Sequence, residues 1–394
     1  MKNEENFLRS MSKVYSVYKP VRNYDYILFF ITIALLLIGL FWVFSSSEYV
    51  AVAVYHRSTY FFEKQLMFAL VGLFAMFIAM HIDFHHLKVL TRPMMYLVVI
   101  LLFATYVPAL GGITVNGASS WLQLPLIHFR FQPSEIAKIV LILFLASVLS
   151  NSEYKTLNIW DRVVLTIPII GIIGIIVFQP DMGNTAIISM AIFTVYFVSG
   201  LNLNRVFVAL SVLGAAAAVI IISNPYQLDR VTNFMNPWND PSGKGFQLIQ
   251  SLIAIGSGGI SGTGLGQSIQ KLFYLPESHT DFIFAVFCEE TGFFGAVCFL
   301  ILMIWLAKRG YAIALKSKDL FIKYLATGIT SLIFGQSVMN IGVVIGILPT
   351  TGITLPFISY GGTSLVINLF CMGLLINASK YTTASNWTVI EGQE

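Results

Sequence analysis

Apolar residues dominate the chain in ten long runs that are separated by shorter polar segments. The runs lie at about 26–46, 65–82, 93–110, 134–150, 163–178, 183–200, 205–223, 282–307, 321–347 and 363–379. Each run is close to the roughly 20 apolar residues that a helix needs to cross a bilayer. The pattern therefore predicts an all-α polytopic membrane protein with ten transmembrane helices.

The polar segments define the expected organisation. Residues 1–22 form a basic tail, residues 23–380 a single membrane domain, and residues 381–394 a polar tail. The longest polar interruption, 224–281, connects the seventh predicted helix to the eighth. It is too short and too rich in glycine to hold a core of its own, so we expect one domain with a large loop.

The distribution of Lys and Arg predicts the orientation. With the N-terminus in the cytoplasm and ten crossings, the inner segments hold most of the 23 basic residues, although the outer segments include the longest loop. Because basic residues accumulate on the cytoplasmic side, both termini are expected inside and the 224–281 loop outside. The first helix follows a long polar tail without a cleavage signal, so it is expected to remain as an anchor.

Composition supports the membrane assignment. Hydrophobic residues make up 57% of the chain and charged residues 11%, whereas soluble domains carry roughly 25% charged residues. The net charge of +4 includes no basic and aromatic patch of the kind that binds nucleic acid, so no nucleic-acid partner is expected.

The 224–281 loop has helical periodicity in one part and many glycines in another. Apolar positions between Phe246 and Ile255 follow a helical rhythm. They predict either an amphipathic helix on the outer leaflet or a re-entrant segment. The glycines between Gly256 and Gly266 lack the Gly-Lys-Ser/Thr ending of a phosphate-binding loop, and they predict flexibility beside a substrate cleft.

Charges within the predicted spans need partners or a function. Glu135 and Lys138 are three residues apart on one helix face, so they could pair, or Lys138 could attract an anionic ligand. Asp181 precedes a predicted helix and is expected to cap it. Glu289 and Glu290 lie deeper in the eighth run and are expected to be structural, paired with a cation from another helix.

The segment 348–362 joins the last two predicted spans. It holds two prolines and three glycines between apolar runs, a pattern that predicts a broken helix or a re-entrant turn. Such a backbone is tolerated at membrane depth only where protein or a wet cavity satisfies its polar groups. It could form a wall of a lipid or sugar site.

The strongest candidate for chemistry is Asp281. It stands where hydrophobic sequence resumes after the long loop, and Glu277 and His279 precede it closely. At the start of a helix Asp281 could be only a cap, with its pKa lowered by the helix dipole. Three ionisable residues at one interfacial position instead favour a reactive centre, with Glu277 and His279 as substrate-binding neighbours.

These motifs, in this order over about residues 20–380, resemble the SEDS family of membrane proteins, which act in shape, elongation, division and sporulation. The sequences Gly264–Lys271 and Leu348–Gly352 are more similar to the cell-division members than to the elongation members, and the sporulation members are also similar. The resemblance implies a peptidoglycan glycosyltransferase of the bacterial cytoplasmic (inner) membrane, with the division septum as the expected site.

Several roles follow from the resemblance alone. Such enzymes polymerise lipid II, a disaccharide-pentapeptide on undecaprenyl diphosphate, with inversion at the sugar carbon. They work beside a class B penicillin-binding protein, which cross-links the strands, and beside other division proteins. The motif His279–Phe284 gives Asp281 the essential acidic position of the family, and Trp121 matches a sensitive loop residue.

One position departs from the family pattern. Family members often carry Arg before the tryptophan, where this chain has Ser120. If that Arg contacts the substrate diphosphate or pairs with an acid in the family, another cation must substitute for it here, and Arg130, Lys138 and Lys271 are the candidates.

The expected reaction needs one general base, because diphosphate leaves without a proton. Asp281 is expected to take the proton of the acceptor hydroxyl, or instead to bind a divalent cation, Mg²⁺ or Mn²⁺. Two other classes of function remain open. A lipid II flippase would depend on charges at mid-membrane, such as Glu135 and Lys138, and a scaffold would need no reactive group. An elongation or sporulation polymerase is the alternative within the same chemistry.

Overall fold

The computed structural model describes residues 23–382 except 116–117, 125–128, 152–153, 155–156, 158, 201–210, 212–213, 216–217, 220–221, 224 and 244. Within these residues each predicted apolar run except 205–223 coincides with a helix. That run falls largely outside the described residues. The helices are α2 (Tyr26–Tyr55), α3 (Tyr60–His81), α4 (Phe84–Ala104), α5 (Pro133–Leu149), α6 (Ile159–Phe178), α7 (Met182–Val198), α11 (Ile283–Lys316), α12 (Leu320–Val344) and α13 (Gly362–Ala378).

Six helices in the described part of the chain are long and apolar enough to cross a membrane: α2, α3, α4, α11, α12 and α13. The apolar helices α6 and α7 are shorter. The protein is therefore a helical, membrane-spanning protein, and the count of ten crossings stays a prediction.

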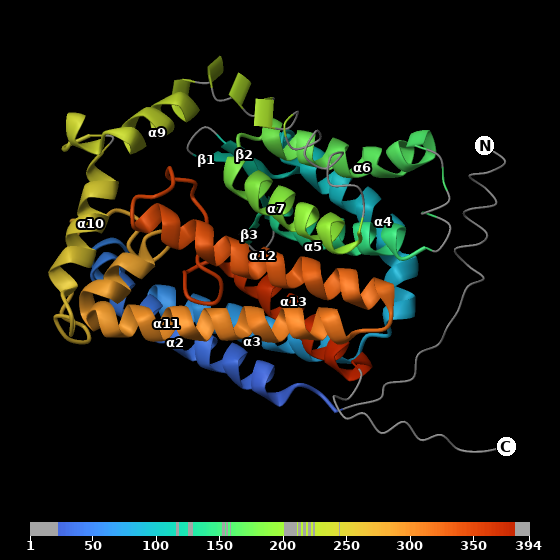
Figure 1. The fold of residues 1–394 in the computed structure, drawn as a ribbon. Helices are drawn as coiled ribbons and strands as arrows, with labels where there is room; N and C mark the ends of the chain where they lie inside the picture. The colour runs from blue at the N-terminus through green and yellow to red at the C-terminus, as the bar shows by residue number, and fades with distance from the viewer. Residues whose placement is uncertain are drawn as a thin grey trace.

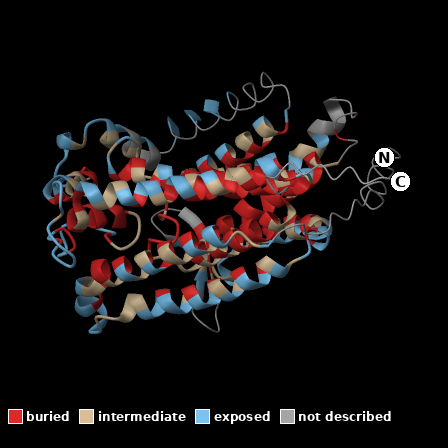
Figure 2. Cartoon of the chain, turned by 60° about the horizontal axis from the view of Figure 1, so that its bottom comes forward, coloured by how far each residue is buried: buried red, intermediate tan, exposed pale blue. Residues whose placement is uncertain are grey.

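The helices differ in how far they are enclosed. Of the most apolar part of α12, 78% is buried, against 22% for α3. Exposed apolar side chains such as Phe30, Phe74 and Ile100 cover the outer helix faces, while the buried residues gather in the centre of the bundle (Figure 2). Helices that are apolar on both their inner and their outer faces are typical of a membrane environment.

The expectation of an all-α fold needs one correction. The connection between α4 and α5 contains the short 3₁₀ helix η1 (Pro108–Leu110) and a three-stranded antiparallel sheet in the order β1-β2-β3. Its strands are β1 (Gly112–Val115), β2 (Ala118–Leu124) and β3 (Phe129–Phe131). The sequence carried a signal for this hairpin, because an Asn-Gly pair at 116–117 interrupts two runs that contain β-branched and aromatic residues.

The long loop contains α9 (Pro225–Met235), η3 (Pro237–Asn239) and α10 (Phe246–Gly258), so the predicted helix is confirmed. The apolar face of α10 packs on protein. Leu248 and Ile249 are buried, and the Ser251 hydroxyl donates to the Val344 carbonyl at 2.7 Å. This contact attaches the loop to the end of α12.

The bundle has two distinct ends. Helices α9 and α10 lie at one end in Figure 1, and the start of α2 and the end of α13 lie at the other. There the Asp25 amide donates to the Ser379 hydroxyl at 2.9 Å, in the short helix η4 (Ser379–Tyr381), and Arg309 forms an ion pair with Asp25. The long loop and the two ends of the described chain are therefore separated by the length of the bundle.

The segment between α12 and α13 is irregular, as its prolines and glycines predict. Residues 355–359 are buried, and side chains from the helices satisfy the backbone of the segment. The Gln65 amide donates to the Ser359 carbonyl at 3.0 Å, and the Gln336 amide donates to the Thr354 carbonyl at 2.9 Å. Broken backbone is thus stabilised by buried amides, as membrane depth requires.

Candidate functional site

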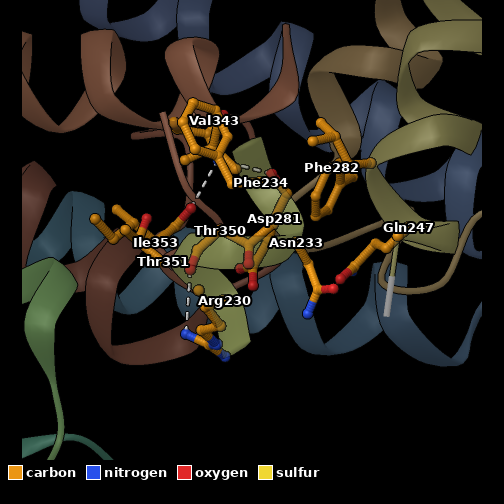
Figure 3. Close-up of a pocket in the computed structure, with 14 residues that line it drawn as sticks. Arg230, Asn233, Phe234, Gln247, Asp281, Phe282, Val343, Thr350, Thr351 and Ile353 are labelled. Carbon is orange, nitrogen blue, oxygen red and sulfur yellow. Dashed lines mark hydrogen bonds between the residues drawn. The ribbon is translucent and has the colours of Figure 1, made fainter. Parts of the chain in front are cut away.

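A cavity of about 240 Å³ lies where the long loop, the start of α11, the end of α12 and the segment 350–353 meet (Figure 3). Its apolar lining comes from Phe234, Leu248, Phe282, Val343 and Ile353. Its polar lining side chains are Arg230, Asn233, Gln247, Asp281, Asn340, Thr350 and Thr351. Polar side chains therefore outnumber apolar ones in this cavity. A concave site where polar groups converge against apolar walls is a typical place for a ligand.

Asp281 enters this cavity from the turn that precedes α11. The helix begins at Ile283, and its N-cap is Phe282, which makes no side-chain cap. The expectation that Asp281 could be a helix cap is therefore wrong. Among the described residues its carboxylate has no hydrogen bond and no ion pair, while its backbone carbonyl accepts the Asn340 amide at 2.7 Å.

The surroundings of Asp281 shift its pKa in the opposite direction from a helix dipole. Burial raises the pKa of Asp281 to about 7. The negative charge of Glu277 adds to this increase in the pKa, and the positive charge of Arg230 opposes it. Burial penalises the ionised form because the cavity hydrates it poorly. A carboxylate with such a pKa can accept and release a proton near neutral pH.

Arg230 brings positive charge to the cavity from α9. Its guanidinium donates to the Thr350 carbonyl at 3.3 Å, which attaches α9 to the segment 350–353 (Figure 3). Sequence reasoning placed Arg230 in the outer loop but not in the site. The available signal was that Arg230 is the single arginine of the 224–281 loop.

Glu277 and His279 lie beside the cavity rather than in its lining. Glu277 is exposed, accepts the Thr280 hydroxyl at 2.7 Å, and acts on Asp281 through its charge. The His279 ring packs against Phe61 at a centroid separation of 4.6 Å. Burial lowers the pKa of His279, against the opposing effect of Glu277, so the imidazole is neutral at neutral pH. Their roles in substrate binding stay predictions.

Lys271, one of the predicted diphosphate cations, is 2% exposed and lies in the protein interior. Its ammonium donates to the Glu290 carboxylate at 2.9 Å, the Ser45 hydroxyl at 3.0 Å and the Gly266 carbonyl at 2.8 Å. The expected cation partner of the buried glutamates is thus Lys271, from the loop. The charge of Lys271 is balanced by Glu290. Lys271 is not among the residues that line the cavity.

Glu289 fixes the same part of the loop. Its carboxylate accepts the Ser268 hydroxyl in a short hydrogen bond, the Ile269 amide at 3.0 Å and the Gln270 amide at 3.4 Å. These donors satisfy the hydrogen-bonding capacity of a buried carboxylate. Glu289 and Glu290 therefore have structural surroundings, as predicted.

Helix α11 is broken next to these glutamates. Gly292 has a φ of 67° and a ψ of −165°, which no helix allows. The loop after α10 satisfies the groups that the break exposes. The Thr263 amide donates to the Glu289 carbonyl at 2.9 Å, and the Phe293 amide donates to the Gly259 carbonyl at 2.9 Å. Loop and broken helix thus complete each other's hydrogen bonds.

This contact explains two glycines of the cluster. A Cβ at Gly258 would lie 2.2 Å from the Cys288 carbonyl oxygen, and one at Gly262 would lie 2.2 Å from the Glu290 carbonyl oxygen. Gly262 also has a φ of +80°. At these positions the glycines allow close backbone packing, a role that the sequence did not predict. Flexibility of the segment stays a prediction.

The whole-chain comparison decides the family. The sequence model of a family described as "Cell cycle protein", which takes its name from FtsW, RodA and SpoVE, matches residues 26–384. The chain belongs to this FtsW/RodA/SpoVE family.

Relatives within the FtsW/RodA/SpoVE family match nearly end to end. "Stage V sporulation protein E" of Bacillus subtilis (strain 168) is 42% identical over 91% of this chain and 97% of its own length. "Probable peptidoglycan glycosyltransferase FtsW" of Geobacter sp. (strain M18) is 38% identical over 92% of this chain and 98% of its own length.

Solved structures of the family share the fold. A chain from a structure described as "Structural coordination of polymerization and crosslinking by a peptidoglycan synthase complex" matches with a TM-score of 0.70 and 32% identity, over 90% of this chain and 97% of that one. The rod shape determining protein RodA of Thermus thermophilus matches with a TM-score of 0.64 and 28% identity, over 91% of this chain and 98% of that one.

The remaining predicted residues of this family member lie outside the lining of the cavity. Trp121 is partly buried in β2, opposite Ile113 of β1. Arg130 in β3 is exposed, and its guanidinium donates to the Gln123 amide oxygen at 3.3 Å. Their predicted contacts with substrate stay predictions.

The charged residues near the start of α5 are joined to each other and to α12. The Lys138 ammonium donates to the Glu135 carboxylate at 2.8 Å and to the Gln336 side-chain oxygen at 3.0 Å. Both charged side chains are almost fully buried. The predicted ion pair between them is confirmed within α5. The hydrogen bond from Lys138 to Gln336 connects α5 to α12.

The helix cap predicted at Asp181 is confirmed, unlike the one considered at Asp281. The Asp181 carboxylate accepts the Asn184 amide at 3.2 Å at the start of α7. It also accepts the Ser134 hydroxyl at 2.9 Å, so the cap connects α7 to α5 as well.

Proposed function

We propose that this chain is a peptidoglycan glycosyltransferase that polymerises lipid II into glycan strands, with Asp281 as its general base. Membership of a family with relatives named as probable peptidoglycan glycosyltransferases supports the reaction class. The observation that supports the site is the state of the Asp281 carboxylate. Among the described residues, its carboxylate has no ion-pair or hydrogen-bond partner, and its pKa is raised to about 7 in a cavity that also holds Arg230.

The reaction can be written with these groups alone. The sugar hydroxyl of the acceptor attacks the anomeric carbon of the donor and passes its proton to the Asp281 carboxylate. The bond from that carbon to the phosphate oxygen breaks, and undecaprenyl diphosphate leaves with the electron pair. Arg230 is the cavity cation that would neutralise the diphosphate. With a pKa near 7, Asp281 then releases its proton to water at neutral pH.

The size of the cavity fits only the reacting part of such a substrate. Its volume of about 240 Å³ is below the roughly 300–1,000 Å³ of typical drug-sized ligand sites. A lipid-linked disaccharide would therefore place its reacting sugar here, and its lipid chain would remain in the bilayer.

Asp281 is the carboxylate that would coordinate a divalent cation in this cavity. In the described part of the chain no group of three or more His, Cys, Asp or Glu side chains could hold a metal ion. Mg²⁺ is commonly held by one or two carboxylates together with substrate phosphates and water, and this donor set fits Asp281 with a diphosphate. The ion would supply positive charge to the leaving group.

The cellular role and assembly follow from the relatives. We propose septal synthesis during cell division, with a class B penicillin-binding protein as the cross-linking partner. A chain similar to this one occurs in a peptidoglycan synthase complex that coordinates polymerization and crosslinking, which supports such a partner. The 42% identity to a stage V sporulation protein makes sporulation the alternative role. The Lys and Arg distribution supports ten crossings, both termini in the cytoplasm and the cavity on the outer face.

The test is the substitution Asp281→Asn, assayed with labelled lipid II in detergent. Asn keeps the size of the side chain and removes its basicity, so polymer formed per folded molecule should fall by ~10²-fold or more. Detergent excludes a flippase explanation, since flipping has no meaning without a bilayer. Near-normal polymerisation by the variant would end the assignment of Asp281 as the base.

Glu277→Gln is the matched control. Glu277 lies on the same segment and carries the same charge, but it is exposed and does not line the cavity. Its loss should reduce polymerisation much less than the loss of Asp281. Equal losses in the two variants would mean that the segment needs negative charge rather than a base at one position.

A further inference from the structure

A single buried amide connects the two walls of the cavity that face each other at Asp281. Asn340 on α12 is 1% exposed. Its Nδ2 donates to the Asp281 carbonyl at 2.7 Å and to the Ile353 carbonyl at 2.7 Å, so both N–H bonds are used. One side chain therefore holds the turn before α11 and the segment after Gly352.

The Asp281 carbonyl is available to Asn340 because the first turn of α11 does not use it. In a regular helix the amide of Ala285 would bond to the carbonyl of residue 281. Here it donates to the Phe282 carbonyl at 3.0 Å. Asn340 thus replaces a helix hydrogen bond at the residue whose carboxylate enters the cavity.

The second carbonyl belongs to the residue after Gly352. Gly352 has a φ of +70°, and a Cβ built on it would lie 3.6 Å from the Asp281 carboxylate oxygen Oδ2. The carboxylate and the backbone of Gly352 therefore face each other directly. The distance between them depends on the amide that holds both neighbours.

The amide of Asn340 satisfies the two carbonyls but leaves its own oxygen without a partner. The Asn340 Oδ1 atom is buried and has no hydrogen-bond partner among the described residues. A buried acceptor without a partner destabilises a fold, because the desolvation of the acceptor is not compensated. An apolar side chain of the same size would avoid that cost, but it could not hold the two carbonyls.

We propose that Asn340 is a positioning residue that fixes the Asp281 carboxylate against the Gly352 wall of the cavity. The proposal rests on the proposed function of Asp281 as base. Reacting groups must be held in the correct geometry, and a displacement of about 1 Å can cost ~10²-fold in rate. Asn340 acts through Asp281, because its amide donates to the Asp281 and Ile353 carbonyls.

Asn340→Leu tests the proposal, since Leu has a similar size and no donor. Asn377 provides a matched control. This amide on α13 is also buried, and it also donates to two carbonyls, of Ala79 at 3.1 Å and Ile82 at 2.7 Å, but at the other end of the bundle. Asn377→Leu should therefore show what the loss of such a double hydrogen bond costs in stability alone.

The readouts are the melting temperature, the maximal rate of lipid II polymerisation per folded molecule, and its pH profile. Both variants should melt at lower temperature. Asn340→Leu should also lose roughly 10- to 100-fold in maximal rate. The rising part of its pH–rate profile, its pH limb, should move to lower pH as Asp281 becomes hydrated. Asn377→Leu should keep the rate and limb of the wild type. If Asn340→Leu does not fold, Asn340→Ser, which retains one donor, replaces it.

Two outcomes would overturn the proposal, and both are separate from a failure of the proposed function. If Asp281→Asn is inactive while Asn340→Leu and Asn377→Leu have the same rate per folded molecule, Asn340 only stabilises the fold. If the rate of Asn340→Leu falls without movement of its pH limb, Asn340 does not act through Asp281. If Asp281→Asn remains active, the base itself is wrong.

Discussion

Two carboxylates near the start of α11 lie in opposite surroundings. Glu290 is buried and accepts hydrogen bonds from Lys271 and Ser45, so its charge is balanced inside the protein. Asp281 lies in the turn just before the same helix. Its carboxylate has no ion pair or hydrogen bond among the described residues, and burial raises its pKa to about 7. Glu290 is buried and Asp281 is half-buried, and of the two only the Asp281 carboxylate is without a protein partner among the described residues.

The difference between these two carboxylates distinguishes a structural role from a chemical one. A buried ion pair satisfies both of its members, and removal of either leaves an uncompensated charge. A poorly hydrated carboxylate without a partner destabilises its own ionised form, a cost that is typical of functional sites. The broken part of α11 therefore holds the loop, and the contrast supports the proposal that Asp281 is the reacting carboxylate.

Glu290→Gln should give the largest effect on stability. Without Glu290 the buried ammonium of Lys271 has no counter-charge, and loss of one partner of a buried ion pair typically costs about 3–5 kcal/mol. The melting temperature should fall strongly at neutral pH. The double variant Glu290→Leu with Lys271→Met should recover much of the loss, and failure to recover would show that the charges do more than hold the loop.

Asp281→Asn should change stability in the other direction at high pH. The pKa of Asp281 in the folded protein, about 7, lies above its ordinary value of 3.8. The stability that the protonated carboxyl contributes is therefore complete below pH 3.8 and is lost as the pH rises to 7. Above pH 7 the neutral Asn variant should be more stable than the wild type by a few kcal/mol, with the difference shrinking toward pH 4. Thermal unfolding from pH 4 to 8 measures this, and a variant less stable throughout would contradict it.

Glu277→Gln should give the smallest effect. Glu277 is exposed, and its charge raises the pKa of Asp281 less than burial does. Removal of that charge should move the pH limb of polymerisation to lower pH by less than about one unit, because exposed charges are screened. The same shift should appear in the wild type at high salt, and a limb insensitive to both changes would exclude Glu277 from the field at Asp281.

Hydrophobic runs predicted most of this fold, because helix-length apolar segments leave few alternatives in a membrane. The small sheet before α5 was missed, since its strands are short and lie between two strong helix signals. The ion pair of Glu135 with Lys138 and the cap at Asp181 followed from local spacing. Local spacing could not find the pairing of Lys271 with Glu290, because it depends on how the loop after α10 returns to α11.

In the candidate site, too, some features could be predicted from the sequence and others could not. Asp281 stands out in sequence because ionisable residues gather where hydrophobic sequence resumes. Its raised pKa was not predictable, since that depends on the walls contributed by α9, α12 and the segment 350–353. Arg230 and Asn340 carry no local motif. They reach the cavity only through the packing of distant elements.

The most direct test of the contrast between the two carboxylates is the pH dependence of lipid II polymerisation at saturating substrate, measured on the wild-type protein. A base with a raised pKa must lose its proton before it can act, so the rate should rise with pH through a single ionisation near 7 and level off above it. A rate that is constant from pH 5 to 8 would contradict the account, because Asp281 would then have the pKa of an ordinary hydrated carboxylate.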